Sequence, residues 1–232
     1  MRVDGRDLRA RVVGEGANLA VTQAGRVEYA QGGGRINTDA LDNSAGVSTS
    51  DHEVNIKILL ADAERAGALT RPQRDSLLAG MTDEVARLVL RDNAEQSLAV
   101  SLEERAGAEA LPAHAALMQR LETAGVLDRS VAGLPDAATM ASRMAAGDAL
   151  TRPAICALLP LAKLWLNDAI EAGALPDDPA FAPLLAAYFP APLRERFGPY
   201  IPRHRLRRDL VATAISNGVA NRLGCAGLSR LA

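Results

Sequence analysis

Two short segments near the N-terminus hold the residues whose types and spacing could do chemistry. Residues 14–18 read Gly-Glu-Gly-Ala-Asn, and residues 43–53 contain Asn43 and Ser50. Glycines allow a backbone to turn tightly and to approach a pyrophosphate closely, and amide and hydroxyl groups can bind polar ligands. The first segment is therefore a candidate phosphate-binding loop.

Each segment also has a simpler structural interpretation. Leu19 stands where a dinucleotide-binding fingerprint would have its third glycine, and thirteen residues precede Gly14, too few for an earlier strand–helix–strand unit. Spacing alone favours a plain turn at the end of a strand. Ser50, with Glu53 three residues later, forms a capping-box pattern, so Ser50 and Asn43 can also be read as cap and turn residues.

The elements that must position these residues are short. Val12-Val13 predicts a buried strand that enters the glycine segment, and residues 26–30 predict either a second short strand or the end of a helix. Three glycines at 32–34 then break any regular element. A helix is predicted from about Asp51 through Arg65, ending near Gly67.

Beyond Gly67 the sequence predicts helices almost throughout. Residues 70–73 (Thr-Arg-Pro-Gln) form a capping box that opens a helix from 71 to about 91. The start Ala-Leu-Thr-Arg-Pro recurs at 149–153, before an apolar helix that Pro160 should kink or interrupt. Further helices are predicted over 112–124, within 133–148 and over 203–223 with Gly224 as the stop, whereas the prolines between 176 and 202 permit only short helices and turns.

Composition gives no electrostatic case for nucleic acid or an anionic membrane as a partner, because 26 Lys and Arg nearly balance 28 Asp and Glu. The basic cluster at 203–208 lacks interleaved aromatics and is interpreted as a solvated helix start or a subunit contact. Two distant cysteines and three scattered histidines lack metal-ligand spacing, so no metal site is predicted. No signal peptide or apolar run of membrane-spanning length is recognised, and a cytoplasmic location is predicted.

Three motifs, in this order and at this distance, resemble the cofactor-domain end of glutamate dehydrogenases. They are Glu-Gly-Ala-Asn at 15–18, Asn-x-x-Gly-Val at 43–47 and Ser-x-x-Glu at 50–53. The fuller strings at 32–47 and 50–60 resemble the large-subunit, NAD-specific bacterial enzymes. That similarity continues through residues 69–70, 81–85, 90–93, 164–166, 188–190, 204–208 and 221–224.

The resemblance implies an oxidoreductase that uses NAD to deaminate L-glutamate to 2-oxoglutarate and ammonia. It implies cofactor contacts at Gly16, Ala17, Asn18 and Asn43, and substrate contacts at Val47 and Ser50. The Ser50 hydroxyl would bind the glutamate side-chain carboxylate and so help to exclude apolar amino acids.

For the fold, the resemblance implies an α/β remnant of a Rossmann-like cofactor domain followed by a mainly α-helical region. Residues 1–67 would be the C-terminal part of the dinucleotide-binding domain, and residues 68–232 a truncated helical C-terminal domain. The family's catalytic lysine and aspartate belong to a preceding substrate domain, and neither Lys57 nor Lys163 matches that lysine. We therefore expect part of an enzyme, inactive alone, whose parent is a homo-oligomer. The alternative is a non-catalytic helical assembly or regulatory module derived from that enzyme.

Overall fold

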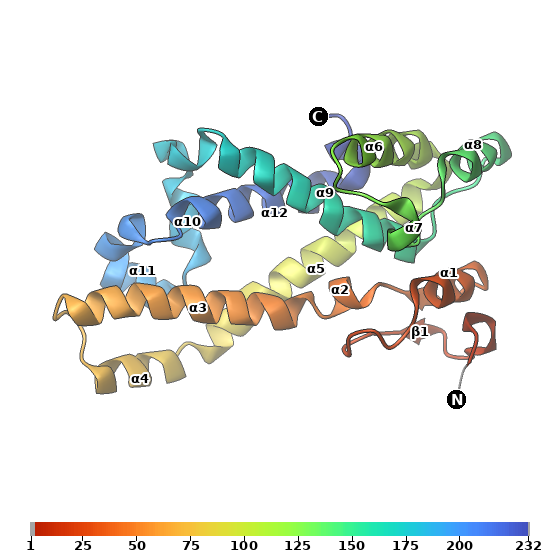
Figure 1. Ribbon diagram of the computed structural model, residues 1–232. Coiled ribbons are helices and arrows are strands. Elements are labelled where there is room, and N and C mark those ends of the chain that lie inside the picture. Colours follow the sequence, from red (N-terminus) through yellow and green to blue (C-terminus); the bar gives the residue numbers. More distant parts are fainter. Residues whose placement is uncertain (1–2, 232) are drawn as a thin grey trace. The chain divides into compact units, whose positions relative to one another are not determined.

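The computed structural model describes residues 3–231, and this part of the chain is mostly helical, as the sequence predicts (Figure 1). Contacts divide the chain into two compact units, each built from separate stretches of sequence. Unit 1 combines residues 1–44, 93–165 and 218–232, and unit 2 combines residues 45–92 and 166–217. The domain boundary near residue 68 remains a prediction.

Unit 1 contains the strands and a set of short helices. These are η1 (Gly5–Asp7), β1 (Val12–Val13), α1 (Gln23–Gln31), β2 (Arg35–Ile36), α2 (Asp39–Asp42), η2 (Gly107–Ala110), α6 (Leu111–Thr123), α7 (Arg129–Ala132) and α8 (Ala137–Ala146). The helices α5 (Thr82–Ala106), α9 (Arg152–Ala172) and α12 (Arg207–Leu228) contribute residues to both units.

Unit 2 contains only helices among its described regular elements. These are α3 (Ser44–Arg65), α4 (Arg71–Ala79), η3 (Leu175–Asp177), η4 (Pro179–Phe181), α10 (Ala182–Tyr188), α11 (Ala191–Phe197) and η5 (Gly198–Arg203). Its core consists of apolar side chains from these helices, from the segments between them and from α12, including Ile56, Leu59, Leu60, Met81, Leu185, Phe189, Leu193, Phe197 and Leu210.

The predicted strand at Val12-Val13 is present and its partner is β2, but the prediction that it is buried is wrong, because Val12 is 67% exposed. The two strands pair in parallel, with Val12 beside Arg35 and Val13 beside Ile36. Residues 26–30 belong to helix α1, so the helical interpretation of that segment is the right one. Thr22 caps α1 by accepting from the Gly25 amide at 3.1 Å.

Gly34 places β2 directly against Tyr29 of α1. The Tyr29 side chain is 3% exposed, and its hydroxyl donates to the Ala10 carbonyl at 2.6 Å. A Cβ atom on Gly34 would lie 2.2 Å from Tyr29 Cζ. The glycine therefore allows the backbone to pack on the tyrosine ring, which a larger residue would prevent.

Helix α3 begins at Ser44, seven residues before the predicted start near Asp51. The Asn93 side-chain amide donates to the Leu41 carbonyl at 2.9 Å and to Ser44 Oγ at 2.8 Å, which holds the turn between α2 and α3. Ser50 consequently lies inside the helix, and the capping-box interpretation of Ser50 is wrong. Glu53 pairs instead with Lys57 on the next turn.

The single helix predicted from 71 to about 91 is two helices. Its start is right, since Gln73 Oε1 accepts from the Thr70 amide at 2.9 Å. Helix α4 ends at Ala79 with Gly80 as its cap, and α5 starts at Thr82. Between them Met81 is 2% exposed in the core of unit 2, so burial of this side chain accompanies the break.

The remaining helix predictions are close to the structure. Helices α6 and α8 match the predicted segments, and short helices fill the proline-dense stretch. Pro160 lies inside α9 without ending it. Helix α12 starts at Arg207 rather than Arg203, and its regular geometry breaks at Gly224, where φ is 59° and ψ is −170°.

The sequence analysis predicted that no apolar run approaches membrane-spanning length, and α9 is an exception to this prediction. Among the described residues it is the helix that is long and apolar enough to cross a bilayer by length and composition. In unit 1, however, Ile155, Cys156, Leu158 and Ala162 of α9 are almost completely buried. This burial is what a core helix of a folded unit requires, so the apolar character of α9 has a structural explanation.

Candidate functional site

The glycine loop, defined here as residues 14–19, follows β1, and residues 37–43 follow β2. Because the strands are parallel, both segments leave from the carboxyl ends of the strands, where ligands bind in open parallel sheets. The predicted residues Gly16, Ala17 and Asn18 are exposed in the glycine loop, and Asn43 caps the end of α2. Unit 1 therefore holds all four predicted cofactor-binding residues.

The structure brings Asn43 together with the glycine loop. The Asn43 side-chain amide donates to Asn18 Oδ1 at 2.8 Å and to the Gly16 carbonyl at 3.2 Å. Three of the four predicted cofactor-binding residues are therefore joined directly by hydrogen bonds, although 25 residues separate the two asparagines.

Two carboxylates that the sequence analysis did not single out hold the ends of the same loop. Asp42 Oδ2 accepts from the Glu15 amide at 2.8 Å, and Asp39 Oδ2 accepts from the Leu19 amide at 2.8 Å. Both aspartates lie on α2, so this one short helix positions the loop at both ends. Their sequence signal was their place inside the string at 32–47 that resembles the family.

Glu15 anchors the loop from its other side. Its carboxylate pairs with the Arg26 guanidinium of α1, with Glu15 Oε2 2.8 Å from Arg26 Nε, and both side chains are almost fully buried. Arg26 Nη2 also lies 3.1 Å from Asp39 Oδ1. The glutamate of the Glu-Gly-Ala-Asn motif is thus a buried structural anchor, while the residues after it stay exposed.

Leu19 has φ of 60°, the left-handed region, although it is not a glycine. Its side chain is 87% exposed, so no apolar packing favours this conformation. The left-handed region costs an ordinary residue about 1–2 kcal/mol. The position therefore has the backbone geometry that glycine favours, and the Asp39 contact to the Leu19 amide opposes the strain.

The Asp39 contact predicts a local pH dependence. The hydrogen bond from the Leu19 amide is the main cause that lowers the pKa of Asp39, with the Arg26 charge acting in the same direction and burial opposing it. A carboxyl whose pKa is lowered by folding stabilises the fold above its unfolded pKa, and this stabilisation is lost as pH falls through the folded value. We expect the Leu19 amide proton resonance to stay constant down from neutral pH and to titrate only below the ordinary pKa of an aspartate. NMR of the chain measures this, Asp39→Asn should abolish the titration, and a midpoint above the ordinary aspartate value would contradict it.

Val47 and Ser50 belong to unit 2, where both side chains are exposed on α3 and Val47 is 73% exposed. They are three residues apart on one helix, so they occupy neighbouring positions on its surface. The Thr49 hydroxyl between them donates to the Ala45 carbonyl at 2.7 Å and is engaged with its own helix. The predicted substrate residues are therefore presented by regular helix rather than by a loop.

A polar cluster secures α3 just after Ser50. The Tyr188 hydroxyl donates to Asp51 Oδ2 at 2.7 Å and accepts from the Asn55 amide at 3.0 Å, and the His52 ring stacks on the Tyr188 ring with centroids 4.3 Å apart. Burial raises the pKa of Tyr188 and lowers the pKa of His52. Both rings are therefore favoured in their neutral forms, which suits packing inside unit 2.

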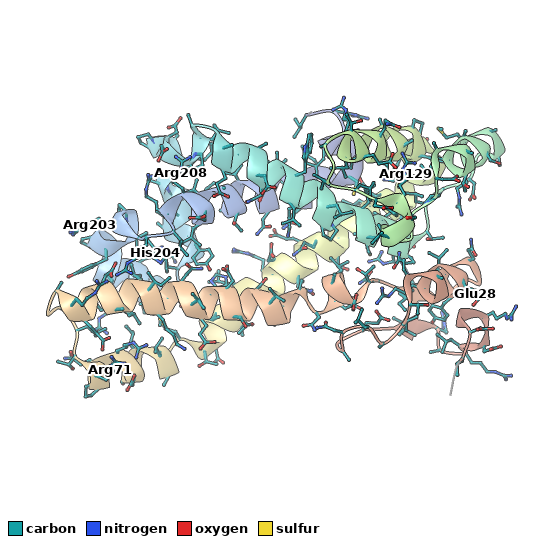
Figure 2. The ribbon with its side chains drawn as sticks, viewed as in Figure 1. Glu28, Arg71, Arg129, Arg203, His204 and Arg208 are labelled. Atoms are coloured by element: carbon teal, nitrogen blue, oxygen red, sulfur yellow. The ribbon has the colours of Figure 1, made fainter. Side chains whose placement is uncertain are left out.

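The basic cluster at 203–208 is divided among several contacts within unit 2. His204 is 3% exposed and bonds the Asn55 carbonyl at 3.1 Å, so it is a structural residue, and burial lowers its pKa (Figure 2). Arg207 and Arg208 both pair with Asp177. The cluster is therefore several separate intramolecular contacts rather than one basic surface.

Comparison with known proteins gives the same family for both ends of the chain. Residues 1–103 match the family model described as bacterial NAD-glutamate dehydrogenase, catalytic domain, and residues 147–232 match the model described as glutamate dehydrogenase, C-terminal. The sequence is 45% identical to the NAD-specific glutamate dehydrogenases of Pseudomonas aeruginosa and Mycobacterium tuberculosis and 42% identical to that of Halomonas elongata. The chain belongs to the bacterial NAD-glutamate dehydrogenase family.

Each of these alignments covers 100% of this chain but 14% of the relative's length. Activity, substrates and cofactor of the longer enzymes are consequently properties of proteins of which this chain matches a small part. The family resemblance drawn from the three motifs is confirmed, and the roles of individual residues within it remain predictions.

Proposed function

We propose that this chain forms part of an NAD-dependent glutamate dehydrogenase, in which it supplies contacts to the nicotinamide side of the cofactor and to the substrate. The reaction is the conversion of L-glutamate, NAD and water to 2-oxoglutarate, ammonia and NADH. The observation that carries the proposal is the hydrogen-bonded set Gly16, Asn18 and Asn43 at the carboxyl ends of paired parallel strands. Family membership and the names of the three relatives support it.

The β1–α1–β2 segment is, in this proposal, the last strand–helix–strand unit of a Rossmann-like cofactor domain. Parallel strands need a crossover connection, usually a helix, and α1 lies between these two strands in the chain. Two-residue strands are too short to form a stable sheet by themselves. The proposal therefore assigns the rest of the sheet to parts of the enzyme outside this chain.

The residues of the glycine loop suit a dinucleotide on chemical grounds. A Cβ atom placed on Gly14 or Gly16 would meet nothing within 4 Å, so the backbone is open on that side. Asn18 Oδ1 already accepts from Asn43, so the Asn18 side-chain N–H groups are the donors assigned to the ribose or nicotinamide. When bound, NAD accepts the hydride that leaves the glutamate α-carbon. The loop residues bind and orient the ring.

Val47 and Ser50 are assigned to the substrate. The Ser50 hydroxyl donates to the side-chain carboxylate of glutamate, and Val47 packs against its methylene groups. A polar group placed for the carboxylate disfavours apolar amino acids, since they would leave that donor unpaired. Val47 and Ser50 are exposed and three residues apart on α3, so the two side chains can contact the apolar and the charged part of one substrate molecule.

No residue of this chain is assigned to proton transfer or to attack by water. Lys57 pairs with Glu53 on the exposed side of α3, and Lys163 donates to Gln96 Oε1 at 3.4 Å. Both lysines are thus engaged in local contacts. The catalytic lysine and aspartate implied by the family resemblance are assigned to other parts of the enzyme, and the parent is proposed to be a homo-oligomer.

A chimeric enzyme tests the proposal. Residues 1–232 would replace the aligned segment of the Pseudomonas aeruginosa relative, with which the chain is 45% identical. We expect glutamate-dependent NADH production by the chimera and none by the isolated chain, because only the chimera contains the whole active site. NADH absorbance measures both. A chimera that folds, by circular dichroism and oligomeric state, but makes no NADH would contradict the proposal.

The competing function, a non-catalytic helical assembly or regulatory module, predicts a different result. In that case the chimera could assemble normally while substitutions at Asn18 and Ser50 left its kinetics unchanged. The two functions are therefore separated by the same chimera, through the kinetic effect of the site variants.

A further inference from the structure

Arg152, the first residue of α9, is a buried arginine at the centre of a polar network in unit 1. Its side chain is 9% exposed. It donates from Nε to Asn37 Oδ1 (2.6 Å), from Nη1 to Ser101 Oγ (2.9 Å) and Glu104 Oε2 (3.0 Å), and from Nη2 to Ser97 Oγ (3.2 Å). All three guanidinium nitrogens are therefore used.

The network continues from Arg152 to the glycine loop through two side chains. The Asn37 amide, whose oxygen accepts from Arg152, donates from Nδ2 to Asp42 Oδ1 at 2.6 Å. Asp42 Oδ2 in turn accepts from the Glu15 amide at 2.8 Å. A charged donor at one end polarises each hydrogen bond in such a chain and fixes the direction of the amide in the middle.

We propose that Arg152 is a positioning residue for the glycine loop, acting through Asn37 and Asp42 on the backbone of Glu15. Arg152 lies in the segment that matches the C-terminal family model, whereas the loop lies in the segment that matches the catalytic-domain model. The effect of Arg152 on NAD binding rests on the proposed function, whereas its effect on the backbone of the glycine loop is independent of that function.

The chemistry of the site requires arginine rather than any cation. The guanidinium group is a rigid fork with five N–H donors, and here its nitrogens meet four partners in fixed directions. A lysine ammonium would retain the charge beside Glu104 but could not also reach Asn37 and both serines. The only other contact at Asn37 Oδ1 among the described residues is a weak one from the Cys156 thiol at 3.5 Å.

The Leu19 end of the glycine loop serves as a control for the Glu15 end, because different side chains hold the two ends. Its far end is held by Asp39, which accepts from the Leu19 amide at 2.8 Å and pairs with Arg26. Arg152 makes no contact with Asp39 among the described interactions. Loss of Arg152 should therefore disturb Glu15 more than Leu19, whereas general destabilisation of unit 1 would disturb both.

NMR of the 232-residue chain tests the positioning role. In Arg152→Met we expect the Glu15 amide proton to move upfield and its exchange with solvent to become roughly tenfold faster, as expected for loss of one hydrogen bond, with little change at Leu19. Arg152→Lys should cause smaller changes of the same kind at Glu15, and this variant replaces Arg152→Met in the test if Arg152→Met does not fold. Arg129→Met is the matched control, because Arg129 is equally buried in unit 1 and its side chain binds Glu122 at 2.7 Å and the Pro135 carbonyl at 3.2 Å rather than any residue of the network from Arg152 to Glu15.

Kinetics of the chimera give the second readout. Arg152→Met should raise KM for NAD by roughly tenfold and Arg152→Lys should raise it less, with KM for glutamate unchanged in both, a separation that general destabilisation would not produce. Equal disturbance of Glu15 and Leu19, or the same pattern in Arg129→Met, would overturn the positioning role. A selective change at Glu15 with an unchanged KM for NAD would uphold the positioning role and contradict the cofactor assignment of the loop.

Discussion

Ser50→Ala in the chimeric enzyme is expected to lower kcat/KM for glutamate by about 10- to 100-fold. Removing a hydrogen bond to a charged group costs about 1.5–3 kcal/mol, which corresponds to this range. The loss should appear in KM for glutamate, with KM for NAD unchanged, because Ser50 is assigned to the substrate carboxylate alone. Steady-state kinetics with each substrate varied in turn measures the separation.

Ser48→Ala is the matched control for this experiment. It makes the same substitution on the same helix, but two residues correspond to a rotation of about 200°, so Ser48 faces away from the direction of Ser50. Ser48→Ala should leave both KM values near those of the parent chimera. If Ser48→Ala, Ser50→Ala and the parent chimera had equal kinetics, the assignment of Ser50 to the substrate site would be contradicted.

Gly34→Ala is expected to destabilise the chain by about 3 kcal/mol, the upper end of the cost of overpacking. The new Cβ atom would lie 2.2 Å from Tyr29 Cζ and 2.4 Å from both neighbouring ring carbons, so it would press on the face of a buried ring. The ring cannot swing away without breaking its hydrogen bond to the Ala10 carbonyl. Urea denaturation followed by circular dichroism measures the loss.

Gly33→Ala separates steric overlap from backbone strain. Gly33 has φ of 88°, but a Cβ atom there would meet nothing within 4 Å. Its replacement should therefore cost only the left-handed strain, about 1–2 kcal/mol. If Gly33→Ala were as damaging as Gly34→Ala, close packing of β2 on Tyr29 would not be the source of the effect.

Local signals in the sequence predicted local structure well. The capping box at Thr70 and Gln73, the strand at Val12-Val13 and the helix over 112–124 each depend on neighbouring residues, and each is present in the structure. The motifs at 15–18 and 43–53 indicated the family through residue types and spacing alone. These features are short-range or are compared residue by residue, so they do not require knowledge of the packing.

The errors arose where distant residues decide the outcome. Helix α3 starts at Ser44, whose Oγ accepts a hydrogen bond from Asn93, 49 residues away. The apolar spacing around Gly80 is helical on both sides, so it could not reveal the break that accompanies burial of Met81. In the same way, the roles of Asp39 and Asp42 depend on contacts to amides 20 and 27 residues earlier.

The continuous helix from Ser44 to Arg65 restricts how this region can change through evolution. An insertion or deletion of one residue between Ser44 and Ser50 would rotate every later side chain of the helix by about 100°, unless the helix were broken. Because Tyr188 holds Asp51, His52 and Asn55, the side chains before the changed position would turn by this angle relative to those three. Length changes here would thus redirect side chains near the start of α3, whereas exchange of the exposed side chains at 47 and 50 would leave the helix as it is. If Val47 and Ser50 contact the substrate as proposed, new ligand preferences would arise through point substitutions on an unchanged backbone.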